Sequence, residues 1–183
     1  MELINIFEGC LFSVKNDSEE LNEYQNIFSK LSDKDFLLNF FKENSEYLNN
    51  EYWRQFNIEP EYAALSVIND LRSLEQYIEK LCNNTQQHVK PDLDEYFEYF
   101  GGKYIYNINY IPMKGYGRNT PTFVRIYAIK VQPNVYIIVY GGLKLGKKIQ
   151  DSPMLKDNVI KRIDATRNFL HSSGILDEND LEI

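Results

Sequence analysis

The sequence predicts an α+β fold in which a small sheet carries an appended block of helices. The first reason is a change of hydrophobic period. Apolar residues recur at three- and four-residue steps over residues 16–100 and alternate in β-branched and aromatic runs after Gly101-Gly102. The second reason is charge, because residues 1–100 carry 8 Lys and Arg against 20 Asp and Glu, whereas residues 101–171 carry 12 against 3. We therefore expect a single domain over 1–183, with an acidic helical insertion at 16–100 and a basic strand–helix module at 101–174.

The N-terminal half is predicted to be a strand followed by helices. Residues 2–15 alternate loosely between apolar and polar side chains, which indicates a strand or one arm of a hairpin. An amphipathic helix is expected at residues 19–31. A second helix should begin after a cap at Ser32-Asp33, and a third is expected at residues 47–56. Residues 59–82 give the strongest helical pattern in the chain, and Pro60 suits the first turn of that helix.

The C-terminal half is predicted to be three strands and a closing helix. Alternating β-branched and aromatic residues indicate strands at 103–111, 122–131 and 135–140. Gln132-Pro133-Asn134 is a short turn that makes the last two strands a hairpin. Residues 153–170 carry apolar side chains on one side and predict a helix, which Gly174 caps.

Composition excludes several classes of protein. No stretch reaches the roughly 18 apolar residues that span a bilayer, and the first residues have acids inside their apolar run, unlike a signal peptide. Cys10 and Cys82 show no CxxC spacing, which predicts two buried thiols in a reducing cytosol. His88 and His171 are poorly placed for a catalytic pair, and no nucleotide-binding or metalloprotease motif occurs. The expectation is a soluble cytoplasmic protein with no membrane, metal or cofactor.

The basic module contains three clusters that suit a phosphate polyanion, because a positive surface attracts and steers such ligands. The first is a predicted Gly-rich loop at residues 114–118, and the second is Arg125, the one arginine of a predicted strand. The third is a set of lysines at 144, 147 and 148 that follows Gly141-Gly142, a pair that would let backbone amides approach a phosphate. For any one lysine the alternative is a solvated loop charge. The candidate RNA-binding residues are Lys114, Tyr116, Arg118 and Tyr127, and the candidate catalytic residues are Arg125, Lys144, Lys147 and Lys148.

Arg125 is the most informative of these residues. A regular strand puts it on one face with Phe123, Tyr127 and Ile129, while Val124, Ile126 and Ala128 form the core face. We expect the Arg125 face to point outward or into a cleft, where an arginine between aromatics would stack bases and pair phosphate. The alternative is an edge arginine lying over tyrosines in a cation–π contact.

The last third of the chain resembles the RelE/HigB-type toxins of bacterial toxin–antitoxin pairs. The similarity lies in the strand Val124-Arg125-Ile126-Tyr127 and in the stretch Lys147-Lys148-Ile-Gln150-Asp-Ser-Pro153 that follows a glycine-ended apolar strand. The family has the order strand, helices, three strands and helix, which agrees with the order predicted above. The chain departs from the family in its much longer helical block. It also has no clear counterpart of the catalytic His, or of the late Tyr or His, of several members.

The resemblance implies a small ribonuclease, cytoplasmic and metal-independent, of the kind that cuts mRNA, in many members on the ribosome, and that pairs with an antitoxin protein. In that role Arg125 would clamp the phosphate, and one of Lys144, Lys147 and Lys148 would act as base or acid. Tyr116 or Tyr127 would stack or orient a base. The alternative is a non-catalytic RNA- or partner-binding module with a RelE-like fold.

The acidic segment at residues 92–100 permits two interpretations. It folds back over the basic face, where its carboxylates compete with phosphate, or it forms a solvated surface that keeps the protein in solution. The four acids concerned are Asp92, Asp94, Glu95 and Glu98.

Overall fold

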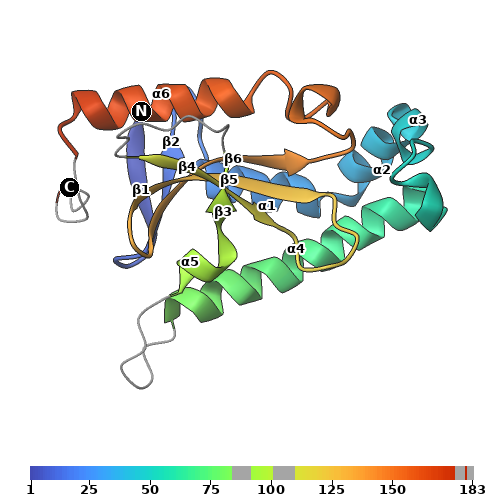
Figure 1. Cartoon of the computed structure of the whole chain (residues 1–183), viewed down its shortest axis with the longest axis horizontal. Coiled ribbons are helices and arrows are strands. Elements are labelled where there is room, and N and C mark those ends of the chain that lie inside the picture. Colours follow the sequence, from blue (N-terminus) through green and yellow to red (C-terminus); the bar gives the residue numbers. More distant parts are fainter. Residues whose placement is uncertain (84–91, 101–109, 176–179, 181–183) are drawn as a thin grey trace.

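A six-stranded mixed sheet lies at the centre of the computed structural model, which describes residues 1–83, 92–100, 110–175 and 180. The strand order is β1-β2-β6-β5-β4-β3, and every neighbouring pair is antiparallel except β2 and β6. Figure 1 shows α6 (Val159–Ser172) on one side of this sheet, and α1 (Glu23–Ser32) and α4 (Pro60–Asn83) on the other. The predicted α+β class is thus confirmed. The strands are β1 (Glu2–Phe7), β2 (Leu11–Lys15), β3 (Glu98–Tyr99), β4 (Ile111–Tyr116), β5 (Val124–Gln132) and β6 (Val135–Leu143).

The helices begin where the sequence offers caps. The Asn22 side chain accepts a hydrogen bond from the backbone N–H of Gln25 (3.0 Å) at the start of α1, and Asp33 does the same for Asp35 and Phe36 at the start of α2. The predicted cap at Ser32-Asp33 is confirmed. The described helices are α1 (Glu23–Ser32), α2 (Lys34–Glu43), α3 (Ser45–Leu48), α4 (Pro60–Asn83), α5 (Leu93–Tyr96) and α6 (Val159–Ser172), with single 3-10 turns η1 (Arg54–Phe56) and η2 (Ile149–Asp151).

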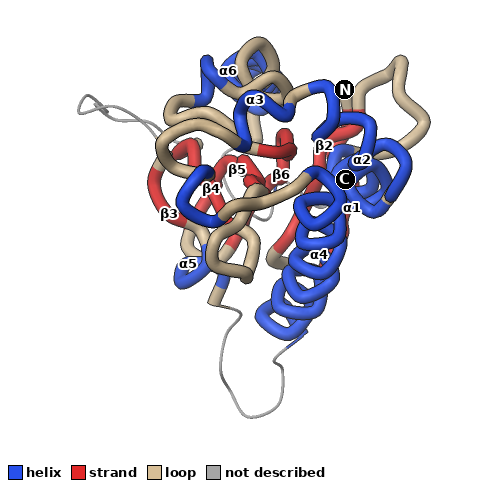
Figure 2. The backbone as a smooth tube through the Cα atoms, turned by 90° about the vertical axis from the view of Figure 1, so that its right-hand side faces the viewer, coloured by secondary structure: helices blue, strands red, loops and turns tan. Residues whose placement is uncertain are grey.

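The core lies on both faces of β5 and β6. Figure 2 shows the backbone of these strands in the middle of the molecule with helices around them. Tyr136 and Ile138 of β6 pack with the α1, α2 and α4 helices, whereas Ile137 and Val139 pack with α6. A strand covered on both faces has no polar alternation, which is why this segment is an unbroken apolar run. The acidic helical block and the basic strands therefore share one of the two core clusters.

Three predicted helices have different limits in the structure. The helix expected over 19–31 begins at Glu23, because Asn22 caps it. The helix expected over 47–56 is reduced to α3, a turn and η1, because Asn50 and Trp53 turn away from helical geometry to donate to the carbonyl of Leu145 (3.0 and 2.9 Å). The closing helix begins at Val159 rather than at residue 153. Before it, Ser152 belongs to a loop, where its hydroxyl accepts from the backbone N–H of Leu145 and Gly146.

The strand predictions need three further corrections. Most of the strand expected at 103–111 lies outside the described residues, and β4 begins at Ile111. Residues 114–116 are therefore part of a strand, not of a Gly-rich loop. The Gly141-Gly142 pair lies inside β6, where a Cβ at Gly141 would be 2.6 Å from Ile27 of α1. The glycine there permits close packing of α1 on the sheet, and it does not cradle a phosphate.

The turn from β1 to β2 brings the two cysteines together. Cys10 is buried next to Cys82 of α4, and both are free thiols, as the sequence predicts. A hydrogen bond between the two thiols lowers the pKa of Cys10 and raises that of Cys82. The contact joins the N-terminal hairpin to the end of the longest helix.

Asp70 of α4 holds the loop between β4 and β5. The carboxylate is 1% exposed, and it accepts hydrogen bonds from the backbone N–H of Arg118, the backbone N–H of Asn119 (2.7 Å) and the hydroxyl of Thr122 (2.5 Å). Gly117 is required here, since a Cβ at this position would lie 1.9 Å from the Asp70 carboxylate. This buried carboxylate thus fixes the ends of β4 and β5.

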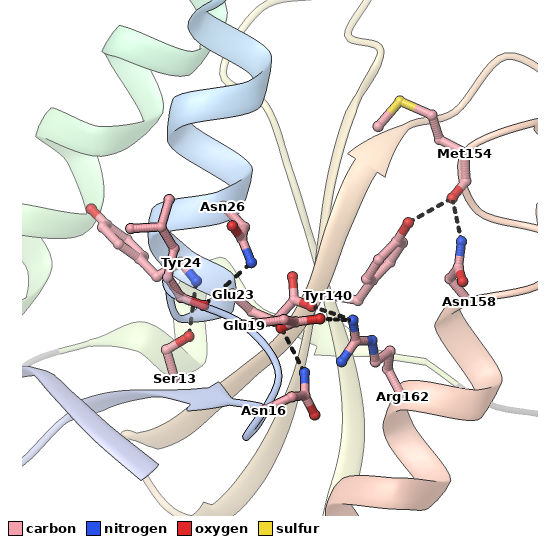
Figure 3. A network of polar contacts seen from close by, with 11 residues as sticks. Ser13, Asn16, Glu19, Glu23, Tyr24, Asn26, Tyr140, Met154, Asn158 and Arg162 are labelled. Atoms are coloured by element: carbon pink, nitrogen blue, oxygen red, sulfur yellow. Dashed lines mark hydrogen bonds and ion pairs between the residues drawn. The ribbon is translucent and has the colours of Figure 1, made fainter. Parts of the chain in front are cut away.

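An ion-pair cluster joins α6 to α1 and to the segment before α1, near the point where β2 no longer pairs with β6 (Figure 3). Arg162 of α6 lies 2.6 Å from Glu19 and 3.2 Å from Glu23. The Glu23 side chain is only 5% exposed. Burial raises the pKa of Glu23 to about 7, the charge of Glu19 adds to that effect, and Arg162 and Lys30 oppose it. Tyr140 of β6 also faces Glu23, whose charge contributes to the raised pKa of the phenol.

The raised pKa of Glu23 predicts a pH-dependent stability. The carboxyl titrates near 4.5 in the unfolded chain and near 7 in the folded one. Its contribution is therefore complete below about pH 4.5 and is lost as the pH rises to about 7. Glu23→Gln should remove this loss. Because one pKa unit corresponds to about 1.4 kcal/mol, the variant should gain about 2–3 kcal/mol relative to the parent between about pH 5 and pH 8.

Urea unfolding over this pH range measures the effect. Glu20→Gln, a matched change at an exposed neighbouring residue, should keep the parent's pH dependence. Identical pH slopes for the parent and Glu23→Gln would contradict the prediction.

A second prediction concerns Asp70. Asp70→Ala leaves three donors of the β4–β5 loop without their acceptor. The free energy of unfolding should fall by about 1–3 kcal/mol, the cost of an unpaired buried polar group. Chemical denaturation measures this loss, and Glu75→Gln on the exposed side of α4 should change it little. A stability equal to that of the parent would show that the loop does not depend on this carboxylate.

Candidate functional site

Most of the predicted site residues converge on one hollow, which we call the cationic hollow. Its larger chamber has a volume of about 940 Å³, and an adjoining chamber of about 300 Å³ shares Tyr116, Arg125, Lys144 and Lys147 with it. Figure 1 shows α3 and the loop that follows β6, both of which contribute to the hollow, at the same end of the molecule. Of the eight predicted residues, the six that line the hollow are Lys114, Tyr116, Arg125, Tyr127, Lys144 and Lys147.

Arg125 is held in a fixed orientation. It lies in β5 opposite Tyr116 of β4, and its guanidinium carbon is 4.3 Å from the centre of the Tyr116 ring. One guanidinium nitrogen, Nη1, donates to the carbonyls of Thr122 (3.2 Å) and Val124 (2.7 Å). Burial lowers the pKa of Arg125, and the nearby tyrosines raise it. The cation–π contact considered from the sequence is thus present, and the same arginine lines the hollow.

The rest of the predicted Arg125 face does not point outward. Tyr127 and Ile129 are at most 1% exposed and belong to the core cluster of α6. Phe123 instead stacks on Trp53, with ring centres 3.9 Å apart. The pairing register shifts between Tyr127 and Ala128, and α6 covers this face of the sheet. Tyr127 lines the smaller chamber but is almost fully buried, which argues against its stacking a base and leaves Tyr116 as the other tyrosine predicted for that role.

The lysines differ in their surroundings. Burial lowers the pKa of Lys144, and the charges of Arg125 and Lys114 lower it further, while Asp151 opposes them. Lys147 is exposed at the junction of the two chambers. Lys114 lies 3.9 Å from the carboxylate of Glu98 and 5.4 Å from the Tyr116 ring centre. Among the described residues, Arg125, Lys144 and Lys147 have no carboxylate within 4.0 Å.

Arg118 and Lys148 lie outside the hollow, in contrast to the prediction. Asp70 fixes the backbone of Arg118, and the guanidinium carbon lies 3.7 Å from the ring centre of Tyr77 on α4. Lys148 is exposed, and its backbone N–H donates to the Asp151 carboxylate (3.2 Å). The sequence neighbours Lys147 and Lys148 thus separate because the loop turns between them at the start of η2.

The opposite wall of the hollow comes from the segment 47–55 of the helical block, which the sequence reasoning did not assign to the site. The pattern there was interpreted as a helix, and a periodic pattern carries no information about contacts with residues so distant in sequence. The Asn49-Asn50 pair was the available signal, because asparagine side chains favour turns over helix interiors. The lining residues of this wall are Tyr47, Asn50, Glu51, Tyr52, Trp53 and Gln55.

The acidic segment after residue 91 divides between the two interpretations. Asp94 lies 2.9 Å from Lys130 and accepts from Tyr136 (2.5 Å) and the backbone of Asn134, at the turn of the β5–β6 hairpin. These hydrogen bonds lower the pKa of Asp94 against the raising effect of its burial. Glu98 alone of the four acids reaches a lysine of the hollow, Lys114. The segment thus fastens the sheet and does not cover the hollow as a whole.

The described residues offer no group of three or more His, Cys, Asp or Glu side chains placed to hold a metal ion. Within the same residues, no helix combines the length and the apolar character needed to cross a bilayer. The ionisable side chains that line the hollow are its cations, its tyrosines and two acids, Glu51 and Asp151.

Comparisons of the chain with protein-family models, with curated proteins and with solved structures found no match.

Proposed function

We propose that the chain binds single-stranded RNA, with a backbone phosphate on Arg125, Lys144 and Lys147. The observation that carries this proposal is the convergence of these three cations on one hollow with no carboxylate partner in the described part of the chain. An arginine presents a planar fork of donors that matches a phosphate, and lysines add charge around it.

The electrostatics of the hollow favour an anionic ligand. Burial lowers the pKa of Lys144, and repulsion from the charges of Arg125 and Lys114 lowers it further. A bound phosphate reverses the repulsion, because an opposite charge nearby stabilises each ammonium and guanidinium group. The acids of the lining, Glu51 and Asp151, leave the hollow with a positive balance.

The order of elements supports a RelE-like toxin as the biological setting. The resemblance implies one N-terminal strand, helices, three strands and a helix. The chain keeps this order, except that residues 2–15 form the two strands β1 and β2 and the short β3 precedes β4. The parallel pairing of β2 with β6 brings the N-terminal hairpin beside the last strand. In this setting the substrate is an mRNA, held on or off the ribosome, and an antitoxin protein is the expected partner.

Loss of one hollow cation should weaken RNA binding. Arg125→Ala should lower the affinity for a single-stranded RNA oligomer about tenfold or more, because a hydrogen bond to a charged group contributes about 1.5–3 kcal/mol. The slope of log affinity against log salt should become shallower by about 0.7 for each lost phosphate contact. Fluorescence anisotropy with a labelled oligomer measures both quantities.

Lys80→Ala is the matched control, since it removes one exposed charge on α4 away from the hollow. It should leave the affinity within about twofold of the parent, an effect well under 1 kcal/mol. An equal loss of RNA affinity in Lys80→Ala and Arg125→Ala would show that binding depends only on net charge. If the parent protein does not bind the RNA oligomer, the proposal is refuted.

Metal-independent cleavage is the second candidate function, and the lowered pKa of Lys144 favours it. In neutral form Lys144 would take the proton of the ribose 2′-hydroxyl as its oxygen attacks phosphorus. Arg125 would stabilise the charge on the phosphorane. The bond to the 5′-oxygen would break as the Lys147 ammonium gives that oxygen a proton. The products are a 2′,3′-cyclic phosphate and a 5′-hydroxyl, so DNA can bind without being cut.

Lys144→Arg separates cleavage from binding. Arginine keeps the positive charge but stays protonated at neutral pH, so the variant should hold RNA and lose at least about 100-fold of its cleavage rate, the range for a lost general base.

Expression of the parent in bacteria should arrest growth, and Arg125→Ala should relieve the arrest at equal protein level. Cleavage products in the presence of a chelator identify the activity. If the parent leaves the RNA intact and does not slow growth, cleavage is contradicted and RNA binding remains as the proposed function.

A further inference from the structure

The cationic wall accounts for only half of the hollow. The facing wall comes from the segment between α3 and η1, which presents tyrosines and a tryptophan. A volume of about 940 Å³ approaches the upper end of the range for small-molecule pockets, far more than one phosphate fills. The space between the two walls therefore suits a ligand with both an anionic and a flat apolar part.

The facing wall is rigid. The Asn50 amide and the Trp53 indole both donate to the carbonyl of Leu145, and the Asn50 side-chain oxygen accepts from the backbone N–H of Tyr52 and Trp53 (3.0 Å each). Trp53 is stacked on Phe123, which packs edge-on against Phe41 in the core. A group presented by such a platform binds with little loss of conformational freedom.

Tyr52 is the group that this platform presents. It is 54% exposed, whereas its neighbour Trp53 is 3% exposed, so the tyrosine adds little to the core. Its ring meets Trp53 and Phe56 at 83° and 64°, an edge-to-face cluster. Tyr52 is also close enough to Arg125 for its phenol to act on the pKa of the arginine. An exposed tyrosine is unremarkable alone, but this one stands at the lip of the cationic hollow.

Charge assigns the two walls to different parts of the ligand. Each side of the lining contributes one acid, Asp151 on the strand side and Glu51 on the side of Tyr52. The lining cations Arg125, Lys144 and Lys147 all lie on the strand side, so only the side of Tyr52 has a negative balance. A phosphate is repelled from the wall with Glu51 and attracted to the opposite one. The tyrosine side is thus left for the uncharged part of the ligand.

We propose that Tyr52 stacks a nucleobase of the RNA whose phosphate lies on Arg125, Lys144 and Lys147, an inference that rests on the proposed function. Stacking requires only the flat face that every base has, so the wall selects bases without selecting a sequence. The helical block therefore forms half of the RNA site and is more than an appendage to the basic module.

A comparison of two ligands tests the proposal. One is a single-stranded RNA oligomer, and the other is an abasic ribose-phosphate oligomer with the same number of phosphates. Tyr52→Ala should lower the affinity for the RNA about 5- to 100-fold and leave the affinity for the abasic oligomer unchanged. Tyr52→Phe keeps the ring and should bind both as the parent does. Tyr62→Ala, a matched change of an exposed tyrosine on α4, should have no effect.

The outcomes separate the two proposals. If the parent binds both oligomers with equal affinity and Arg125→Ala loses that binding, the stacking role of Tyr52 is overturned. The phosphate site at Arg125 is then retained. An equal drop for both oligomers in Tyr52→Ala would also overturn it, because that pattern reflects damage to the fold. Failure of the parent to bind either oligomer would refute the proposed function itself. Unchanged abasic binding by Tyr52→Ala shows that the variant is folded.

Discussion

The rest of the structure depends on the burial of both faces of the β5–β6 pair. Helices α1, α2 and α4 pack on one face and α6 on the other, so these two strands present almost no side chain to solvent along their middle. Polar groups can occur only where a strand passes beyond the helices. Arg125 and Lys144 lie near such an end, at the start of β5 and just after β6. The core thus decides where the chain can place a charged site.

The acidic and basic halves of the chain are interleaved in space, and this explains which cations remain unpaired. Acids of the helical block lie against cations of the strand–helix module: Glu19 and Glu23 bind Arg162, Asp94 binds Lys130, and Glu98 approaches Lys114. These contacts fasten the sheet edges and α6. The remaining cations at the hollow are those that no carboxylate of the described chain neutralises, so the separation of charge along the sequence becomes a local charge imbalance.

Periodicity predicted the elements that have a local cause. The helix Pro60–Asn83, the cap at Asp33 and the β5–β6 hairpin follow from spacing and turn residues within a few positions. The limits of α3 and α6 did not. Asn50 and Trp53 bond to Leu145, which is 95 and 92 residues away, and Ser152 bonds back to the same loop, so a helical period does not report either contact. For the site, residue type predicted the cations, but Arg118 was misplaced because a buried Asp70 redirects its backbone. For the Tyr52 wall the local signal was limited to the Asn49-Asn50 pair, which favours a turn but does not indicate a contact with Leu145.

The anchoring of Trp53 and Asn50 to Leu145 also sets when the hollow can form during synthesis. The two hydrogen bonds join residues 92 and 95 positions apart. A chain made from its N-terminus exposes the aromatic wall long before the residues that complete the cationic one leave the ribosome. Closing so long a loop is slow, because its conformational entropy is lost before the contacts between its two ends can stabilise the fold. The two walls of the hollow therefore cannot come together before Leu145 and the lysines beside it have been made.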